Sequence, residues 1–264
     1  MLAERWRAAA RILVPAVLVA GGFSVTGARA DDDAAQVWHV TVSPEVGATG
    51  FKGNGSVGPL SGRLRMPFHD VAKDTRFAFA GGVAASRGPV GFWLAGQYLD
   101  MSQNFTFDRG DVSGKAKGHA TQLNAGGWYQ AWDKSLGGTT VHGTPQQVTV
   151  SPLAGVRWTR LKATLDADGM SASQQATWAI PFAGAQVSAD LTPNFLMTAE
   201  ADTGAWGRDF TLQGQAYLGY RLAILGLPAV MRVGYQALHQ DHKETDLHWN
   251  VTQYGPVAGL SVTF

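Results

Sequence analysis

The eleven residues that end the chain, YGPVAGLSVTF (Tyr254–Phe264), alternate between two kinds of side chain. One set of alternate positions is apolar and holds Tyr254, Pro256, Ala258, Leu260, Val262 and Phe264. The positions between them are mostly glycine, serine and threonine. A period of two places successive side chains on opposite faces of a β-strand. This segment therefore predicts a strand with one face suited to lipid and one suited to an enclosed interior.

The same alternation runs back through the chain. It is nearly strict over Phe210–Leu222, which a helix with its repeat of 3.6 residues cannot accommodate. Strands of this length suffice to cross a membrane, which takes about 9–11 tilted residues. The pattern predicts ten strands, at about 37–51, 75–87, 90–102, 117–131, 150–165, 174–191, 194–205, 209–223, 228–241 and 250–264.

The first 30 residues have the order of a secretory leader. Arginines precede an apolar run at 12–23, and Ala28 and Ala30 form a small-x-small cleavage site. The run is shorter than the ~20 residues of a spanning helix, which favours a cleaved leader over an uncleaved anchor. We therefore expect residues 1–30 to be a signal peptide, 31–36 an acidic tether and 37–264 the folded barrel.

Composition supports an exported membrane protein. The chain has no cysteine, 33 glycines and only 16% charged residues, below the ~25% of ordinary soluble domains. Without residues 1–30, 17 basic and 19 acidic residues remain, so no basic face for nucleic acid is expected. Glycine- and aromatic-rich chains with short alternating segments are typical of transmembrane barrels. We therefore predict an all-β, antiparallel, up-and-down transmembrane barrel in the bacterial outer membrane.

The connections between the predicted strands are of two kinds. With both termini in the periplasm, short inner turns fall near residues 88–89, 192–193 and 225–227, as such barrels require. The segment 132–149 is too long for a simple inner turn, so it either extends its two strands or forms a small periplasmic flap. The alternation shifts phase near Pro181, where either a bulge or an edge of the membrane zone is expected. A count of eight strands remains the alternative.

The chain resembles known barrels at its end. The aromatic Phe264, preceded by Val262, Leu260 and, further back, Tyr254, resembles the sorting signal of outer-membrane barrel proteins. In that family the insertion machinery reads this last strand, which implies that machinery as a partner during biogenesis. Segments such as 153–159, 234–238 and 255–260 are similar to a group of uncharacterised small proteobacterial outer-membrane barrels.

The predicted phase directs several charged residues into the lumen. An unpaired buried charge is very costly, so opposite charges in a narrow interior are expected to pair. The expected network joins the acids Glu45, Glu200 and Asp202 to the bases Arg157, Arg221 and Arg232. Such a network either fills the barrel as a structural plug or lines a narrow pore for small solutes. No cofactor and no metal is expected.

A second candidate is the segment His239–His248, which holds three histidines and three acids in ten residues. Such groups could hold a metal or act as a base, but their spacing matches no rigid ligand motif. We find no acid–histidine constellation placed as outer-membrane proteases or lipid A-modifying barrels would need.

The leading functional hypothesis is a non-enzymatic barrel with a structural role in the envelope, embedded among outer-membrane lipid and lipopolysaccharide. Two alternatives remain open. One is a lipid A-modifying or protease-like enzyme that uses His239–His248. The other is an adhesin or surface-binding barrel built on the predicted outer loops 52–74 and 103–116.

Overall fold

A computed structural model describes residues 37–57, 60–66, 75–106, 113–167, 170–244 and 247–264. The predicted signal peptide and acidic tether lie outside these residues, as do parts of the predicted outer loops. Among the described residues, no helix is long and apolar enough to span a membrane. The strands are β1 (His39–Gly47), β2 (Gly50–Val57), β3 (Leu60–Met66), β4 (Thr75–Arg87), β5 (Val90–Thr106), β6 (Ser113–Tyr129), β7 (Trp132–Thr139), β8 (Pro145–Ala167), β9 (Met170–Asp190), β10 (Phe195–Trp206), β11 (Asp209–Ile224), β12 (Leu227–Lys243) and β13 (Leu247–Thr263).

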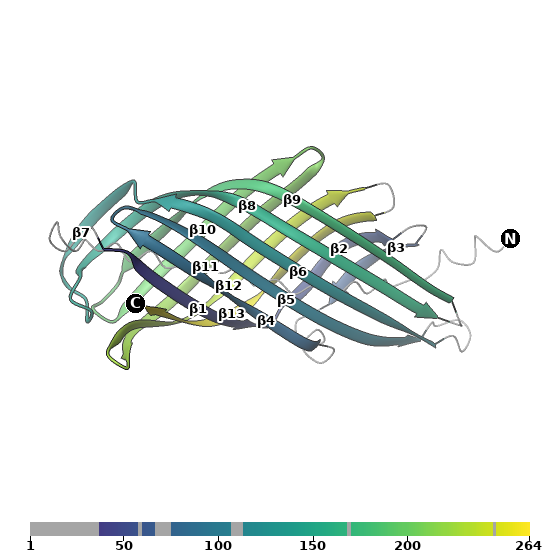
Figure 1. Ribbon diagram of the computed structural model, residues 1–264, viewed down its shortest axis with the longest axis horizontal. Coiled ribbons are helices and arrows are strands. Elements are labelled where there is room, and N and C mark those ends of the chain that lie inside the picture. The colour runs from purple at the N-terminus through teal and green to yellow at the C-terminus, as the bar shows by residue number, and fades with distance from the viewer. Residues whose placement is uncertain (1–36, 58–59, 67–74, 107–112, 168–169, 245–246) are drawn as a thin grey trace.

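The sheet closes on itself (Figure 1). In the described chain the ring runs β1-β4-β5-β6-β8-β9-β10-β11-β12-β13, and β13 returns to β1 with Val42 opposite Val262. All of these pairings are antiparallel, which confirms the predicted ten-stranded up-and-down barrel. Closure pairs the backbone N–H and C=O groups of every wall strand, and lipid could not satisfy them.

Three strands, β2, β3 and β7, lie outside this ring of ten. β2 continues β1 along β13, with Gly50 opposite Tyr254, and β3 pairs with β2 at the same end. β7 pairs with β8 at the opposite end, where Trp132 faces Val150. The segment 132–149 therefore forms a hairpin extension of β8. Its loop lies against neighbouring turns through Val141 N donating to Pro193 O at 3.2 Å.

The two ends of the barrel differ. The end with the C-terminus and β7 carries tight turns, whereas β8 and β9 continue furthest at the other (Figure 1). We call these the short-turn end and the extended end. At the short-turn end, β11 passes to β12 through Leu225 and Gly226, with positive φ of 53° and 81°. Two positive φ values twist a two-residue hairpin turn to match its strands.

The expected bulge at Pro181 is wrong. Pro181 pairs with Val156 in an unbroken register along β8, and its neighbour Phe182 pairs with Gly204 of β10. Alternate residues are buried from Ala176 to Asp190, apart from the half-buried Gly184, so the strand keeps one phase throughout. The pattern looks shifted because the inward side is apolar at Trp178, Ile180 and Phe182 but polar from Gln186 onward.

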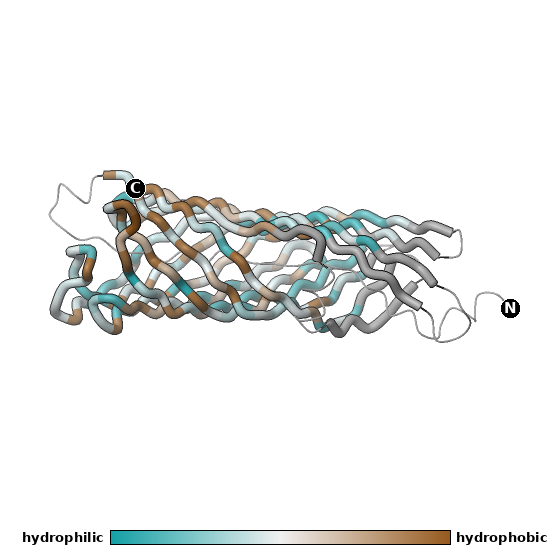
Figure 2. Tube along the Cα trace, turned by 90° about the horizontal axis from the view of Figure 1, so that it is seen from below, coloured by the Kyte–Doolittle hydropathy of each residue, from teal (hydrophilic) through white to brown (hydrophobic). Residues whose placement is uncertain are grey.

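The two faces of the wall differ in polarity, and the difference is the reverse of a soluble protein's. Large apolar side chains point outward and are exposed, and Figure 2 shows hydrophobic segments gathered toward the short-turn end. Buried inward positions are mostly polar. The exposed set includes Val42, Phe79, Phe92, Leu94, Leu123, Val156, Met197, Leu212, Leu218, Met231 and Val233. We call this the apolar belt, and it is the exterior of a transmembrane barrel.

Candidate functional site

Among the described residues, the lumen holds three arginine–carboxylate ion pairs. Arg157 Nη2 lies 3.1 Å from Asp202 Oδ2, and both side chains are 1% exposed. Arg232 donates to Glu45, which joins β12 to β1 beside the closure of the sheet. Arg221 donates to Asp190, close to the short-turn end. Each of the three lumen arginines thus reaches one carboxylate, so its positive charge is compensated inside the barrel.

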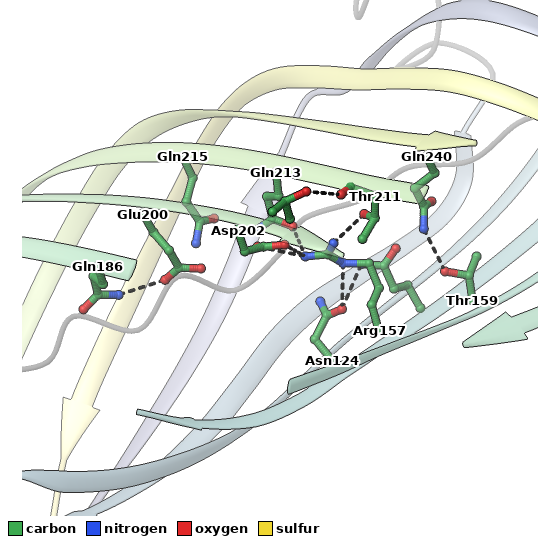
Figure 3. A network of polar contacts seen from close by, with 12 residues as sticks. Asn124, Arg157, Thr159, Gln186, Glu200, Asp202, Thr211, Gln213, Gln215 and Gln240 are labelled. Carbon is green, nitrogen blue, oxygen red and sulfur yellow. Dashed lines mark hydrogen bonds and ion pairs between the residues drawn. The ribbon is translucent and has the colours of Figure 1, made fainter. Parts of the chain in front are cut away.

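Arg157 is the centre of the largest of these groups (Figure 3). Its guanidinium donates to Thr211 Oγ1 and Gln213 Oε1, each at 2.6 Å, and to Asp202. Its Nε donates to Asn124 Oδ1 at 3.2 Å. The guanidinium carbon also lies 4.7 Å from the centroid of the Phe182 ring. These partners come from β6, β9, β10 and β11, so one side chain ties together much of the wall across the lumen.

The structure places Glu200 differently from the expected network. Its carboxylate accepts a hydrogen bond from Gln186 Nε2 at 2.9 Å, and no ion pair to a lumen arginine is among the described contacts (Figure 3). Asp190, absent from the sequence-based set, takes the place opposite Arg221 and also accepts from Gln147 N at 2.9 Å. The six predicted residues all face inward, but as separate groups.

Aromatic rings fill the lumen beside Arg157. Trp93 and Trp128 lie 6.0 Å apart, and Trp93 lies 6.4 Å from Phe182, measured between ring centroids. Glycine makes this possible: a Cβ on Gly91 would sit 2.1 Å from a ring carbon of Trp128, and one on Gly126 would sit 2.5 Å from Trp93. The rings therefore lie flat over bare backbone on neighbouring strands, and they close the lumen against β5, β6 and β9.

Between Arg157 and the extended end, the lumen has a cavity with a neutral lining. A cavity of about 10 Å³, room for about one water molecule, lies among glutamine and tryptophan side chains. Trp178 Nε1, Gln122 Oε1 and both amide atoms of Gln253 have no hydrogen-bond partner among the described residues. Gln240 donates to Thr159 Oγ1 at 3.2 Å (Figure 3). The lining includes Gln97, Gln122, Thr159, Trp178, Gln240, Trp249 and Gln253.

The three histidines of His239–His248 do not converge. His239 accepts or donates at Thr252 Oγ1, 3.0 Å away, and His248 lies 3.3 Å from Asp241 on the outer face. His242 instead faces the lumen, where it stacks on Trp178 at 4.3 Å and lies 2.9 Å from Asp209. No group of three or more metal-ligating side chains occurs among the described residues.

The residues of the predicted sorting signal lie on the closing strand. Tyr254, Leu260 and Val262 belong to β13, the strand that pairs with both β12 and β1. Phe264 is 60% exposed, and its N–H donates to Val40 O at 2.8 Å. Recognition of this strand by insertion machinery stays a prediction.

The closed antiparallel ring, the apolar belt and the polar lumen define a transmembrane β-barrel, the class of protein found in bacterial outer membranes. No protein-family model matches the chain, and no curated protein matches its sequence.

Several solved barrels are similar in structure. The outer membrane protease OmpT from Escherichia coli aligns over 86% of this chain and 97% of its own, with 9% identity and a TM-score of 0.48. Ail, the attachment invasion locus protein of Yersinia pestis, aligns over 86% and 99%, with 13% identity and a TM-score of 0.34. The toluene transporter TodX of P. putida aligns over 86% and 89%, with 10% identity and a TM-score of 0.28. The function has to be argued from this chain's own residues.

Proposed function

We propose that this chain is a non-enzymatic outer-membrane barrel with a closed lumen and a structural role in the envelope. The observation that carries the proposal is the position of Arg157, whose guanidinium bonds to side chains from three other strands across the interior. A side chain held by that many partners is a fixed obstruction. The predicted signal peptide and sorting strand support delivery to the outer membrane.

The energetics of the ion pairs support closure. A mobile gate would have to separate Arg157 from Asp202, and separating a fully buried pair leaves two charges without compensation. Breaking one such pair typically costs about 3–5 kcal/mol, which makes an open state rare at equilibrium. The aromatic rings of Trp93 and Trp128 occupy the wall side of the same region. The lumen is therefore better suited to stiffening the wall than to passing ions.

A narrow pore is the second candidate, and the neutral cavity near Trp178 and Gln253 favours it. Amide groups without protein partners can hold water, so this part of the lumen suits small polar solutes. The enzyme alternative draws less support, because His242 points away from His239 and His248. Surface binding by loops 52–74 and 103–116 stays a prediction, since much of both loops lies outside the described residues.

Planar-bilayer conductance tests the closed lumen. We expect the purified barrel to be silent, whereas the double variant Arg157→Ser/Asp202→Ser, which removes the central pair without leaving a lone charge, should conduct. The matched control is Lys243→Ser/Asp241→Ser, which removes an exterior pair with a 2.9 Å contact. That control should be as silent as the unmodified barrel. Steady conductance by the unmodified barrel would refute the closed-lumen proposal and favour the pore.

A further inference from the structure

The outer surface just beyond the apolar belt carries a group of cations on two adjacent strands. Arg160 and Lys162 of β8 face outward and are exposed, and Lys117 of β6 lies on the same face. The register sets Lys162 directly opposite His119 and Arg160 directly opposite Thr121. We call Arg160 and Lys162, which lie beside Lys117, the basic patch.

The nearest described carboxylate on the β6 side of the patch is Asp100 of β5, which lies 3.5 Å from His119. Strand β9 supplies no negative charge to Arg160 or Lys162. Across that strand pair, Arg160 lies opposite Thr177 and Lys162 opposite Gln175, both neutral. The hydrogen bond described for Arg160 goes to Gln175 Oε1 at 2.9 Å. Among the described side chains, no carboxylate forms an ion pair with Arg160 or Lys162. Like charges on neighbouring positions of a sheet repel, so this arrangement suits an external anion.

The same height on another part of the wall shows the opposite arrangement. On β12 and β13 the outward cation Lys243 lies 2.9 Å from Asp241, and His248 lies 3.3 Å from the same carboxylate. The cations there contact Asp241, whereas Arg160 and Lys162 contact no carboxylate among the described side chains. This contrast argues that the basic patch is a specific feature and not a general property of the polar extension.

The depth of the patch matches the lipid headgroup layer. The outward residues preceding Arg160 on β8 are Val156 and Trp158, the last apolar positions of the belt on that strand. Two residues along a strand tilted by about 40° rise roughly 5 Å along the barrel axis. Headgroups occupy about 5–7 Å on each side of the hydrocarbon core. Arg160 thus lies at the depth of the lipid phosphates, and Lys162 lies roughly 5 Å further out, toward the extended end.

We propose that the basic patch binds the phosphates of an anionic, phosphorylated lipid of the outer leaflet, of the lipopolysaccharide class, while its acyl chains lie against Trp158 and Val156. Guanidinium and ammonium groups are the usual protein partners of phosphate. The inference rests on the proposed outer-membrane location, with the extended end outside. It adds a defined lipid site to that location.

The experiment measures lipid A retained by the folded, full-length barrel in detergent, by mass spectrometry after size exclusion. The unmodified barrel should retain bis-phosphorylated lipid A but not the dephosphorylated form with the same acyl chains. Removing each cation should weaken binding about fivefold, so Arg160→Gln/Lys162→Gln should weaken it roughly 25-fold. Lys243→Gln, at similar height but in an internally compensated pair, should retain lipid A normally.

Further arms separate the possible outcomes. Arg160→Lys/Lys162→Arg keeps both charges and should retain lipid A, which rules out a mere folding defect. Displacement of the lipid by an equal concentration of inorganic phosphate would contradict the proposal, because a free ion lacks the apolar contacts. Equal retention by Arg160→Gln/Lys162→Gln and the unmodified barrel would also overturn it. If the unmodified barrel conducts but still retains lipid A, only the closed-lumen proposal is refuted. If the unmodified barrel is silent but does not retain lipid A, only the lipid site is refuted.

Discussion

The lumen has two halves that differ in how their polar groups are satisfied. Toward the short-turn end, each of Arg157, Arg221 and Arg232 reaches a carboxylate. Toward the extended end, neutral amides and indoles surround a cavity of about 10 Å³, and several of their polar atoms have no partner among the described residues. The carboxylate described there, Asp209, lies 2.9 Å from His242 and contacts no arginine of the described chain. Charge inside a barrel needs a specific partner, whereas neutral amides tolerate incomplete bonding.

The difference has a physical origin. Leaving an ion unpaired in the interior costs several kcal/mol, but leaving one neutral amide atom unbonded costs about 1–3 kcal/mol, less where water reaches it. The charged half should therefore be sensitive to single substitutions and rigid, and the neutral half should be tolerant. The proposed closure of the lumen therefore lies in the half that holds the ion pairs.

The largest expected effect comes from Asp202→Ala. It leaves the Arg157 guanidinium, 1% exposed, without its carboxylate, and should lower the free energy of unfolding by about 3–5 kcal/mol. Urea unfolding followed by heat-modifiable gel mobility measures this. Asp241→Ala is the control, because its partner Lys243 is 40% exposed and an exposed pair contributes about 0–1 kcal/mol. Similar losses of stability in both variants would show that the lumen pair is solvated and that the charged half is no more sensitive to substitution than the exterior.

Strand β9 shows how much of the difference between the two halves of the lumen can be predicted from the sequence. Strict alternation predicts the ring of ten, and the inward phase of Arg157, Arg221 and Arg232 follows from their strands. The alternation pattern does not identify Asp190 as a lumen residue, for a specific reason. The apolar inward residues Trp178 and Ile180 make the phase appear to change at Pro181, and one continuous phase would have put Asp190 inside the lumen.

Other features could not be obtained from alternation. Which acid pairs with which base depends on the shear of the closed sheet and on contacts across the lumen. Arg157 and Asp202, for example, lie 45 residues apart in the chain. The sequence shows the hairpin of β7 and β8 only as a segment too long for a turn, because strands that pair outside the ring have no sequence periodicity of their own.

A smaller effect should come from Gly126→Ala, which probes how tightly the charged half is packed. A Cβ there would sit 2.4 Å from the carbonyl oxygen of Ala154, so the backbone or the Trp93 ring must shift. We expect a loss of about 1–3 kcal/mol in the same unfolding measurement. Gly214→Ala, where a Cβ would meet nothing within 4 Å, should change stability little. An unchanged Gly126→Ala variant would mean that the aromatic layer is loose and does not help to close the lumen.

The smallest effect should come from Gln240→Leu in the neutral half. The variant loses the bond to Thr159 Oγ1, but it also removes Oε1, a buried acceptor without a partner among the described residues. These changes oppose each other, so unfolding should shift by less than about 1 kcal/mol. Gln213→Leu is the matched variant in the charged half, where the amide accepts from Arg157 at 2.6 Å, and a bond to a charged group contributes about 1.5–3 kcal/mol. Both variants replace a buried glutamine with leucine, so their losses of stability can be compared directly. Equal losses would mean that the glutamine amides are equally constrained in both halves of the lumen, which would then differ in composition but not in rigidity.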